Sequence, residues 1–169
     1  MRKLLGTVGA VAALAAAVGA CWAIGTAHPV PDPTPRGDQL GMEDGETRDE
    51  YVARANASIG EDLADASAYA LVSFQQPVAA EEAARVVEGV ERVNAVVAKQ
   101  HAPVAVPEPV AGATRADVFA RAVGDDIAAL VVRDSSEVLR AVAQNPGVLA
   151  VEALPPDAVW GAFGVREVR

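Results

Sequence analysis

The feature that most constrains this chain is an uncharged, apolar run near its N-terminus. No charged residue occurs from Leu4 to Ala27, and the run follows the cations Arg2 and Lys3. A helix needs about 20 consecutive apolar residues to cross the hydrocarbon core of a bilayer. Because cations favour the cytoplasmic side, we expect a single-pass cell-membrane protein with its N-terminus cytoplasmic and its C-terminal part extracytoplasmic.

Three interpretations of residues 1–27 stay open. An uncleaved transmembrane helix is favoured by the apolar continuation through Ile24 and by Trp22, because indole rings prefer the headgroup region. A cleaved signal peptide has a shorter apolar stretch of about 7–15 residues. The third is a lipoprotein signal, since Val18-Gly19-Ala20-Cys21 resembles a relaxed bacterial lipobox. That resemblance implies lipidation of Cys21. As the only cysteine, it has no intrachain disulfide partner.

The charge of the rest of the chain restricts its partners. All 23 acidic residues but only 12 of the 14 basic residues lie after residue 28, a net charge of −11. Nucleic-acid binding requires clustered lysine and arginine to displace counterions. Anionic lipid likewise attracts polybasic segments. The composition therefore predicts no nucleic-acid partner, and no membrane contact with anionic lipid beyond the N-terminal segment.

The chain after this segment divides into a spacer, a helix and one domain. Residues 28–46 are rich in proline, glycine and acid, and their alternating prolines favour an extended path that holds the domain away from the membrane. Residues 47–60 are predicted to form a helix that begins with a capping box of Thr47 and Glu50. Residues 61–169 are enough for one small domain.

Strand and helix patterns alternate through this domain. Short apolar, β-branched runs indicate strands, and periodic segments with acidic first turns indicate helices. We expect Pro77 to end the first strand and Asp134 to cap the last helix. The predicted strands are 68–74, 92–98, 127–132 and 148–154, the predicted helices are 79–88, 115–123 and 135–143, and 100–112 is predicted to be irregular.

Two strand–helix–strand units separated by an insertion predict an α+β fold. The arrangement is the ferredoxin-like split βαβ fold, with a four-stranded sheet and two helices on one face. The first two strands, joined by a helical crossover, should be parallel and right-handed. The tail Val159–Val165 is expected to pack back on the domain as an edge segment.

The sequence offers few candidates for chemistry, and we expect no enzyme. Histidines and paired carboxylates occur without the converging spacing that a metal site or a catalytic acid–base pair requires. Adjacent serines fit a helix start. We therefore expect no catalytic, cofactor-binding or metal-binding residue. The groups considered are His28, His101, Glu61-Asp62, Glu81-Glu82, Asp125-Asp126 and Ser135-Ser136.

Residues 128–157 resemble the second half of the inhibitory propeptides of subtilisin-type proteases. The resemblance implies a ferredoxin-like arrangement and a stand-alone inhibitor-like or chaperone-like module. It is carried by Leu139-Arg140-Ala141-Val142, Asn145-Pro146-Gly147-Val148, Ala150-Val151-Glu152 and Pro155-Pro156-Asp157.

The order of elements also resembles an uncharacterised family of actinobacterial membrane-anchored proteins. The shared features are an apolar segment, a proline spacer, a helix containing Tyr51-Val52-Ala53-Arg54 and a strand from Ala70 to Phe74. This resemblance implies a location and an order of elements, and it carries no activity.

These observations predict a membrane-anchored extracytoplasmic protein-interaction domain with an envelope protein as its partner. The expected contact surfaces are the open face of the sheet and its edge strand. A protease-inhibitor-like module, with the tail after Asp157 entering a protease cleft, is one alternative. A small-ligand-binding regulatory domain is another.

Overall fold

The computed structural model describes residues 37–60, 63 and 66–169. The predictions for the N-terminal segment, for Cys21 and His28, and for Glu61-Asp62 lie outside these residues. Within the described part of the chain, no helix is both long enough and apolar enough to span a bilayer.

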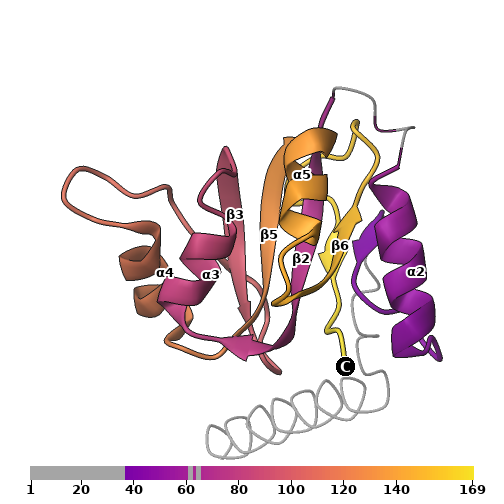
Figure 1. Ribbon diagram of the computed structural model, residues 1–169, viewed down its shortest axis with the longest axis horizontal. Helices are drawn as coiled ribbons and strands as arrows, with labels where there is room; N and C mark the ends of the chain where they lie inside the picture. The colour runs from indigo at the N-terminus through magenta and orange to yellow at the C-terminus, as the bar shows by residue number, and fades with distance from the viewer. Residues whose placement is uncertain (1–36, 61–62, 64–65) are drawn as a thin grey trace, which may run out of the picture. The chain divides into compact units, whose positions relative to one another are not determined.

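A five-stranded antiparallel sheet with the order β4-β3-β5-β2-β6 forms the centre of the described fold (Figure 1). β2 and β3 both run antiparallel to β5, which lies between them, so they are parallel to each other without being adjacent. The four predicted strands are present, and the short β4 is an addition within the segment predicted to be irregular. The strands are β2 Ser67–Val78, β3 Arg92–Ala98, β4 Val104–Ala105, β5 Ile127–Ser135 and β6 Val148–Ala153.

Helices accompany this sheet, so the fold is mixed α+β. α4 has the predicted bounds, whereas α2, α3 and α5 are one to three residues shorter than predicted. The helices are α2 Arg48–Ser58, α3 Ala80–Val86, α4 Arg115–Val123 and α5 Ser136–Ala143.

The helix starts follow from their capping residues, with one correction. The Thr47 hydroxyl accepts from the Glu50 N–H and the Glu50 carboxylate accepts from the Thr47 N–H, which confirms the predicted capping box. The prediction that Asp134 caps α5 is wrong, because the cap is Ser135. Asp134 instead accepts from the backbone N–H groups of Ser135 and Glu91.

The prediction that Pro77 ends the first strand is also wrong, since β2 continues to Val78. The ladder between β2 and β5 is interrupted between Ser73 and Val78, and Pro77 is exposed within that interruption. Proline is tolerated in a strand where the ladder has a bulge, because no N–H is needed there.

The larger core lies between the sheet and helices α3, α4 and α5. Alternate residues of the strands face it, as the two-residue period of a strand requires. Phe119 of α4 and Leu139 of α5 are almost completely buried in this core.

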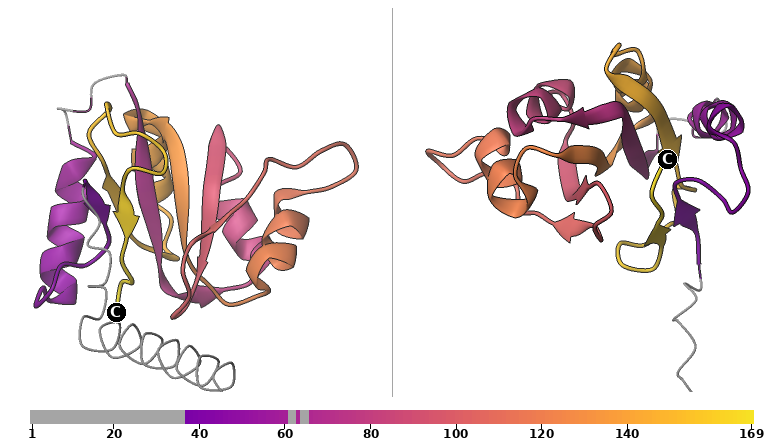
Figure 2. Two further views of the ribbon diagram at one scale, coloured as in Figure 1. Left: turned by 180° about the vertical axis from the view of Figure 1, so that it is seen from behind. Right: turned by 90° about the horizontal axis from the view of Figure 1, so that it is seen from below.

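The opposite face of the sheet is covered by the two ends of the described chain. β1 (Gln39–Leu40) pairs in parallel with β7 (Gly164–Val165), and this two-stranded sheet lies across from α3 and α5 (Figure 2). Leu40 is fully buried there against Leu71 and Val131. The tail therefore packs back on the domain as predicted, but it covers a face and is not an edge segment of the main sheet. The open sheet face that we expected is not open. Residues 37–46, assigned to the spacer, contain a strand of the fold.

One edge of the main sheet is covered by a helix, and the other ends in a short, exposed strand. α2 packs along β6, and the Ser58 hydroxyl accepts the outward-facing N–H of Ala153. At the other edge, β4 pairs with β3, and the Glu108 carboxylate accepts from the Val93 N–H. Unpaired edge groups are the usual route to strand addition by a partner. These edges leave little room for that route.

Candidate functional site

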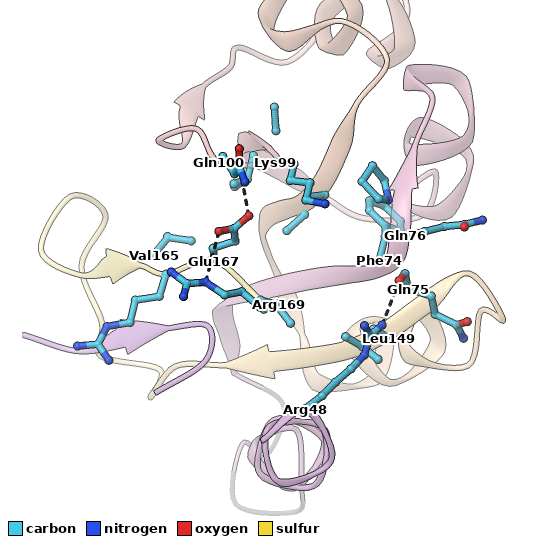
Figure 3. Close-up of a pocket in the computed structure, with 17 residues that line it drawn as sticks. Arg48, Phe74, Gln75, Gln76, Lys99, Gln100, Leu149, Val165, Glu167 and Arg169 are labelled. Carbon is cyan, nitrogen blue, oxygen red and sulfur yellow. Dashed lines mark hydrogen bonds and ion pairs between the residues drawn. The ribbon is translucent and has the colours of Figure 1, made fainter. Parts of the chain in front are cut away.

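A cleft of about 660 Å³ remains on the second face of the sheet, where β3 ends and β5 begins (Figure 3). Ligand pockets in proteins have volumes of about 300–1,000 Å³. The tail that follows β7 forms one wall of the cleft, and the first residue of α2, Arg48, lies at another.

The floor of the cleft is apolar. It is built from Val97, Ala129 and Leu149 of three strands, together with Val168 of the tail, and Phe74, a member of the larger core, also lines the cleft. Val97 and Ala129 belong to the smaller core between the sheet and the β1–β7 pair. Each keeps about 7% of its surface exposed, whereas Val131 further along β5 is fully buried. The cover of the second face is therefore incomplete at this end.

The rim of the cleft carries more positive than negative charge. Arg48 and Lys99 are exposed, and the Arg169 Nε lies 3.6 Å from a carboxylate oxygen of Glu167. Arg166 also lines the cleft, but its guanidinium is paired at 3.8 Å with Asp44. Glu167 is the one carboxylate side chain among the lining residues, in a chain whose formal net charge is −9.

Local backbone irregularities create the cleft. After Ser73 the register of β2 with β6 shifts, and the Gln75 N–H donates to the Gly147 carbonyl at 3.0 Å. Arg48 donates to the Gln75 carbonyl, also at 3.0 Å, so the bulge is held between α2 and the turn before β6 (Figure 3). At the end of β3, Gln100 has a left-handed φ of 59°, which turns the chain away from the sheet.

The Gln100 turn is attached to the tail. The Gln100 N–H donates to the Glu167 carboxylate at 3.2 Å. Glu167 therefore joins the loop after β3 to the wall of the cleft and is also paired with Arg169. This contact fixes the width of the opening on that side.

The described lining of the cleft offers groups that suit the binding of a ligand. It combines aliphatic and aromatic carbon with cations and amide groups. Within the described residues, no group of three or more His, Cys, Asp and Glu side chains is placed to hold a metal ion.

A second concentration of charge is buried at the junction of α2, β6 and the segment after β1. The Glu152 side chain, about 4% exposed, pairs with Arg54, and its other oxygen accepts from the Gly41 N–H at 2.6 Å. Arg54 also pairs with Glu46 at 2.8 Å and donates to the Gly41 carbonyl. We call Glu46, Arg54 and Glu152 the junction cluster.

The pKa values of the junction cluster move in directions set by burial and pairing. Burial raises the pKa of Glu152, against the opposing effects of the Gly41 N–H and Arg54. The Arg54 hydrogen bond lowers the pKa of Glu46 to about 2. Burial also raises the pKa of Tyr51, whose hydroxyl lies 3.1 Å from that of Ser73. The charged groups of the junction cluster are all paired with groups of the protein, so the cluster connects α2, β6 and the segment after β1.

The residues singled out in the sequence do not converge on one site. His101 is exposed, with Nδ1 2.8 Å from the Lys99 carbonyl, and Glu81 and Glu82 lie in the first turn of α3. Asp125 accepts from the Ala80 N–H at the start of α3. The cleft residues were missed because they come from six separate parts of the sequence and carry no shared motif.

Comparison with known proteins gives no match, whether with protein-family models, curated proteins or solved structures. The class of protein is therefore defined by the fold alone: a mixed α+β domain built on a five-stranded antiparallel sheet.

Proposed function

We propose that this protein is a membrane-tethered extracytoplasmic binding domain whose cleft takes a small ligand with an anionic head and an apolar body. The single observation that carries this proposal is the combination of an apolar floor with exposed cations at the rim, in a strongly acidic chain. The apolar N-terminal run supports the tether.

The finer fold assignment belongs to the same proposal. The order β3-β5-β2-β6, with helices between β2 and β3 and between β5 and β6, supports a ferredoxin-like split βαβ fold extended by β4 and α2. Membership of the actinobacterial family of membrane-anchored proteins stays a prediction.

The chemistry of the rim supports the anionic head. Arg48 and Lys99 are exposed side chains with hydrogen-bond donors, and an isolated cation attracts a carboxylate or a phosphate. Arg48 uses one guanidinium nitrogen for the Gln75 carbonyl, which orients the group and leaves its other donors available. The strand residues of the floor support an apolar body, because they lose water when it binds.

The proposal is tested by titrating the full chain in phosphatidylcholine nanodiscs with hexyl phosphate, hexanol and inorganic phosphate, using calorimetry and empty nanodiscs as a blank. We expect hexyl phosphate to bind more tightly than either fragment. Arg48→Gln and Lys99→Gln should each weaken it about fivefold, since an exposed ion pair contributes up to about 1 kcal/mol.

Arg121→Gln is the matched control, because Arg121 is exposed on α4 and does not line the cleft. If all three cation variants bind hexyl phosphate with equal affinity, the proposed anionic head is contradicted. Tighter binding of hexanol than of hexyl phosphate by the parent protein would contradict it as well.

The first expectation, a protein-interaction domain, relied on an open sheet face and an edge strand; the face is covered, and the two-residue β4 is the short edge strand that remains exposed. The protease-inhibitor-like alternative depends on a free tail after Asp157, but Val165 pairs with Leu40 and Val168 packs on the domain. Among the three functions considered, the small-ligand domain is the one that the contacts of the described residues favour.

A further inference from the structure

An exposed apolar loop lies between β6 and β7. Val159 is 66% exposed and Trp160 is 42% exposed, and they are adjacent in sequence. The Trp160 ring packs 5.8 Å from that of Tyr69 and 5.7 Å from that of Phe163. We call Val159, Trp160 and the two rings beneath them the aromatic loop.

The aromatic loop is rigidly supported. The rings of Tyr69 and Phe163 lie 5.3 Å apart, and the Arg133 guanidinium lies 5.7 Å from the centre of the Tyr69 ring. Tyr69 is in the interior strand β2, so the Trp160 ring rests on the sheet. Presenting this ring to a partner costs little conformational entropy, because its supports are already fixed.

The N-terminal part of the chain joins the domain beside this loop. The Gly164 N–H donates to the Asp38 carbonyl at 3.0 Å, and a Cβ added at Gly37 would overlap the carbonyl oxygen of Ala162. The described chain therefore begins in contact with the backbone of Ala162 and Gly164, the residues on either side of Phe163.

The length of chain before Gly37 limits how far this loop is from the apolar run. Nine residues, 28–36, separate Ala27 from Gly37, which makes ten steps from one Cα atom to the next. An extended chain spans at most about 3.5 Å per residue, which limits the separation to about 35 Å. The aromatic loop is therefore beside the point where the described chain begins, a short stretch of sequence after the apolar run.

We propose that the aromatic loop docks on the uncharged interfacial zone of the membrane that holds the N-terminal segment. This inference rests on the tether in the proposed function. Tryptophan and tyrosine favour the membrane–water interface, because each combines an apolar ring with a polar group. The acidic chain disfavours anionic lipid, so a zwitterionic surface is the fitting partner. The tether raises the effective concentration of that surface.

The test uses the fluorescence of Trp160 in the full chain. The sequence has two tryptophans, so Trp22→Phe makes Trp160 the single reporter. The protein is reconstituted in phosphatidylcholine vesicles with and without brominated acyl chains, and flotation of the vesicles is measured on the same samples. We expect the protein to float with the vesicles, with blue-shifted Trp160 emission that brominated lipid quenches.

Val159→Asp should abolish the quenching, because it places a charge at the docking surface. The matched control Val110→Asp changes a valine that is 77% exposed on another loop, and it should leave the quenching unchanged.

The outcomes separate the docking from the tether and from the ligand. Protein that floats with the vesicles while Trp160 is unquenched overturns the docking and leaves the tether in place. A blue shift that grows with protein density, without quenching, indicates contact between copies and also overturns it. Protein that does not float overturns both docking and tether. Hexyl phosphate binding is measured separately and is independent of all three results.

Discussion

Glu152 illustrates how a single buried charge organises several parts of this protein. Its carboxylate accepts from the Gly41 N–H and pairs with Arg54, and it is only about 4% exposed. A buried carboxylate is costly unless hydrogen bonds and an opposite charge compensate. Here the compensating groups come from α2 and from the segment after β1, so the charge specifies how these elements meet β6.

Replacing Glu152 tests the strength of this junction. Glu152→Ala should lower the free energy of unfolding by about 2–4 kcal/mol, because it leaves the Gly41 N–H and part of Arg54 without a partner. Glu152→Gln keeps an acceptor of similar size and should cost about 1 kcal/mol. Urea unfolding measures both variants. Glu88→Gln, an exposed site with no such contacts, should stay within about 0.5 kcal/mol of the parent protein. If Glu152→Ala is as stable as Glu88→Gln, the junction cluster does not stabilise the fold.

Glu46 gives the junction cluster a pH dependence with a defined sign. Its pKa in the folded protein is about 2, below its ordinary value of 4.5. A carboxyl group with a lowered pKa stabilises the fold above the unfolded pKa and loses that contribution as pH falls toward the folded value.

Glu46→Gln removes this titration. The parent protein should therefore be more stable than Glu46→Gln at pH 6, and the difference should shrink between pH 4.5 and pH 2. Unfolding curves at a series of pH values measure the difference. A difference that stays constant over this range would show that the charge of Glu46 plays no part.

At the scale of elements, the ends of the described chain hold the second face of the sheet closed. β1 and β7 are only two residues each, so their pairing alone contributes little. Leu40, Phe163 and Val165 supply the cover by packing on Leu71 and Val131. Gly41 lets the chain pass close to the tail, because a Cβ there would overlap the carbonyl oxygen of Arg166.

A pair of glycine substitutions isolates this close approach. Gly41 and Gly45 both have positive φ, of 100° and 84°, but only Gly41 meets another part of the chain. Gly45→Ala should cost about 1 kcal/mol from backbone strain alone. Gly41→Ala should cost about 3 kcal/mol, because it also pushes the tail away. Thermal unfolding measures both, and equal losses would mean that the tail does not hold β1 in place.

The long elements of this fold were predictable because each carries its own local signal. β3 and α4 have the predicted bounds. A local apolar run defines β3, and the capping residues Thr114 and Gly124 define the two ends of α4, so neither depends on distant parts of the chain. β1, β4 and β7 have no such signal, because two residues are too few for a period and their pairing depends on chain segments far away. The open sheet face was expected for the same reason: nothing local in residues 37–41 indicates that they cover it.

The cleft was unpredictable for a related reason. The local sequence places Arg48 at the start of a helix and Lys99 after the end of a strand, and the structure has both residues there. Their common site arises from the β2 bulge and from the tail, both of which are consequences of tertiary packing. The absence of a recognisable catalytic motif in the sequence carried no information about a binding cleft, which needs only shape and charge.

At the scale of the whole molecule, the described residues form a sheet covered on both faces and, along the β6 edge, by α2. Such a domain offers a partner few unpaired strand groups. Two surfaces differ from this closed pattern: the cleft with its cationic rim, and the aromatic loop beside the point where the described chain begins. We assign ligand binding to the first and membrane docking to the second.

Hydrogen–deuterium exchange locates the ligand on the domain and so tests whether it binds in the cleft. The full chain in nanodiscs is compared with and without hexyl phosphate at saturating concentration. We expect slower exchange in peptides covering residues 74–76, 97–100 and 165–168, with little change in α4. Protection confined to other segments, or no protection while calorimetry reports binding, would contradict binding in the cleft.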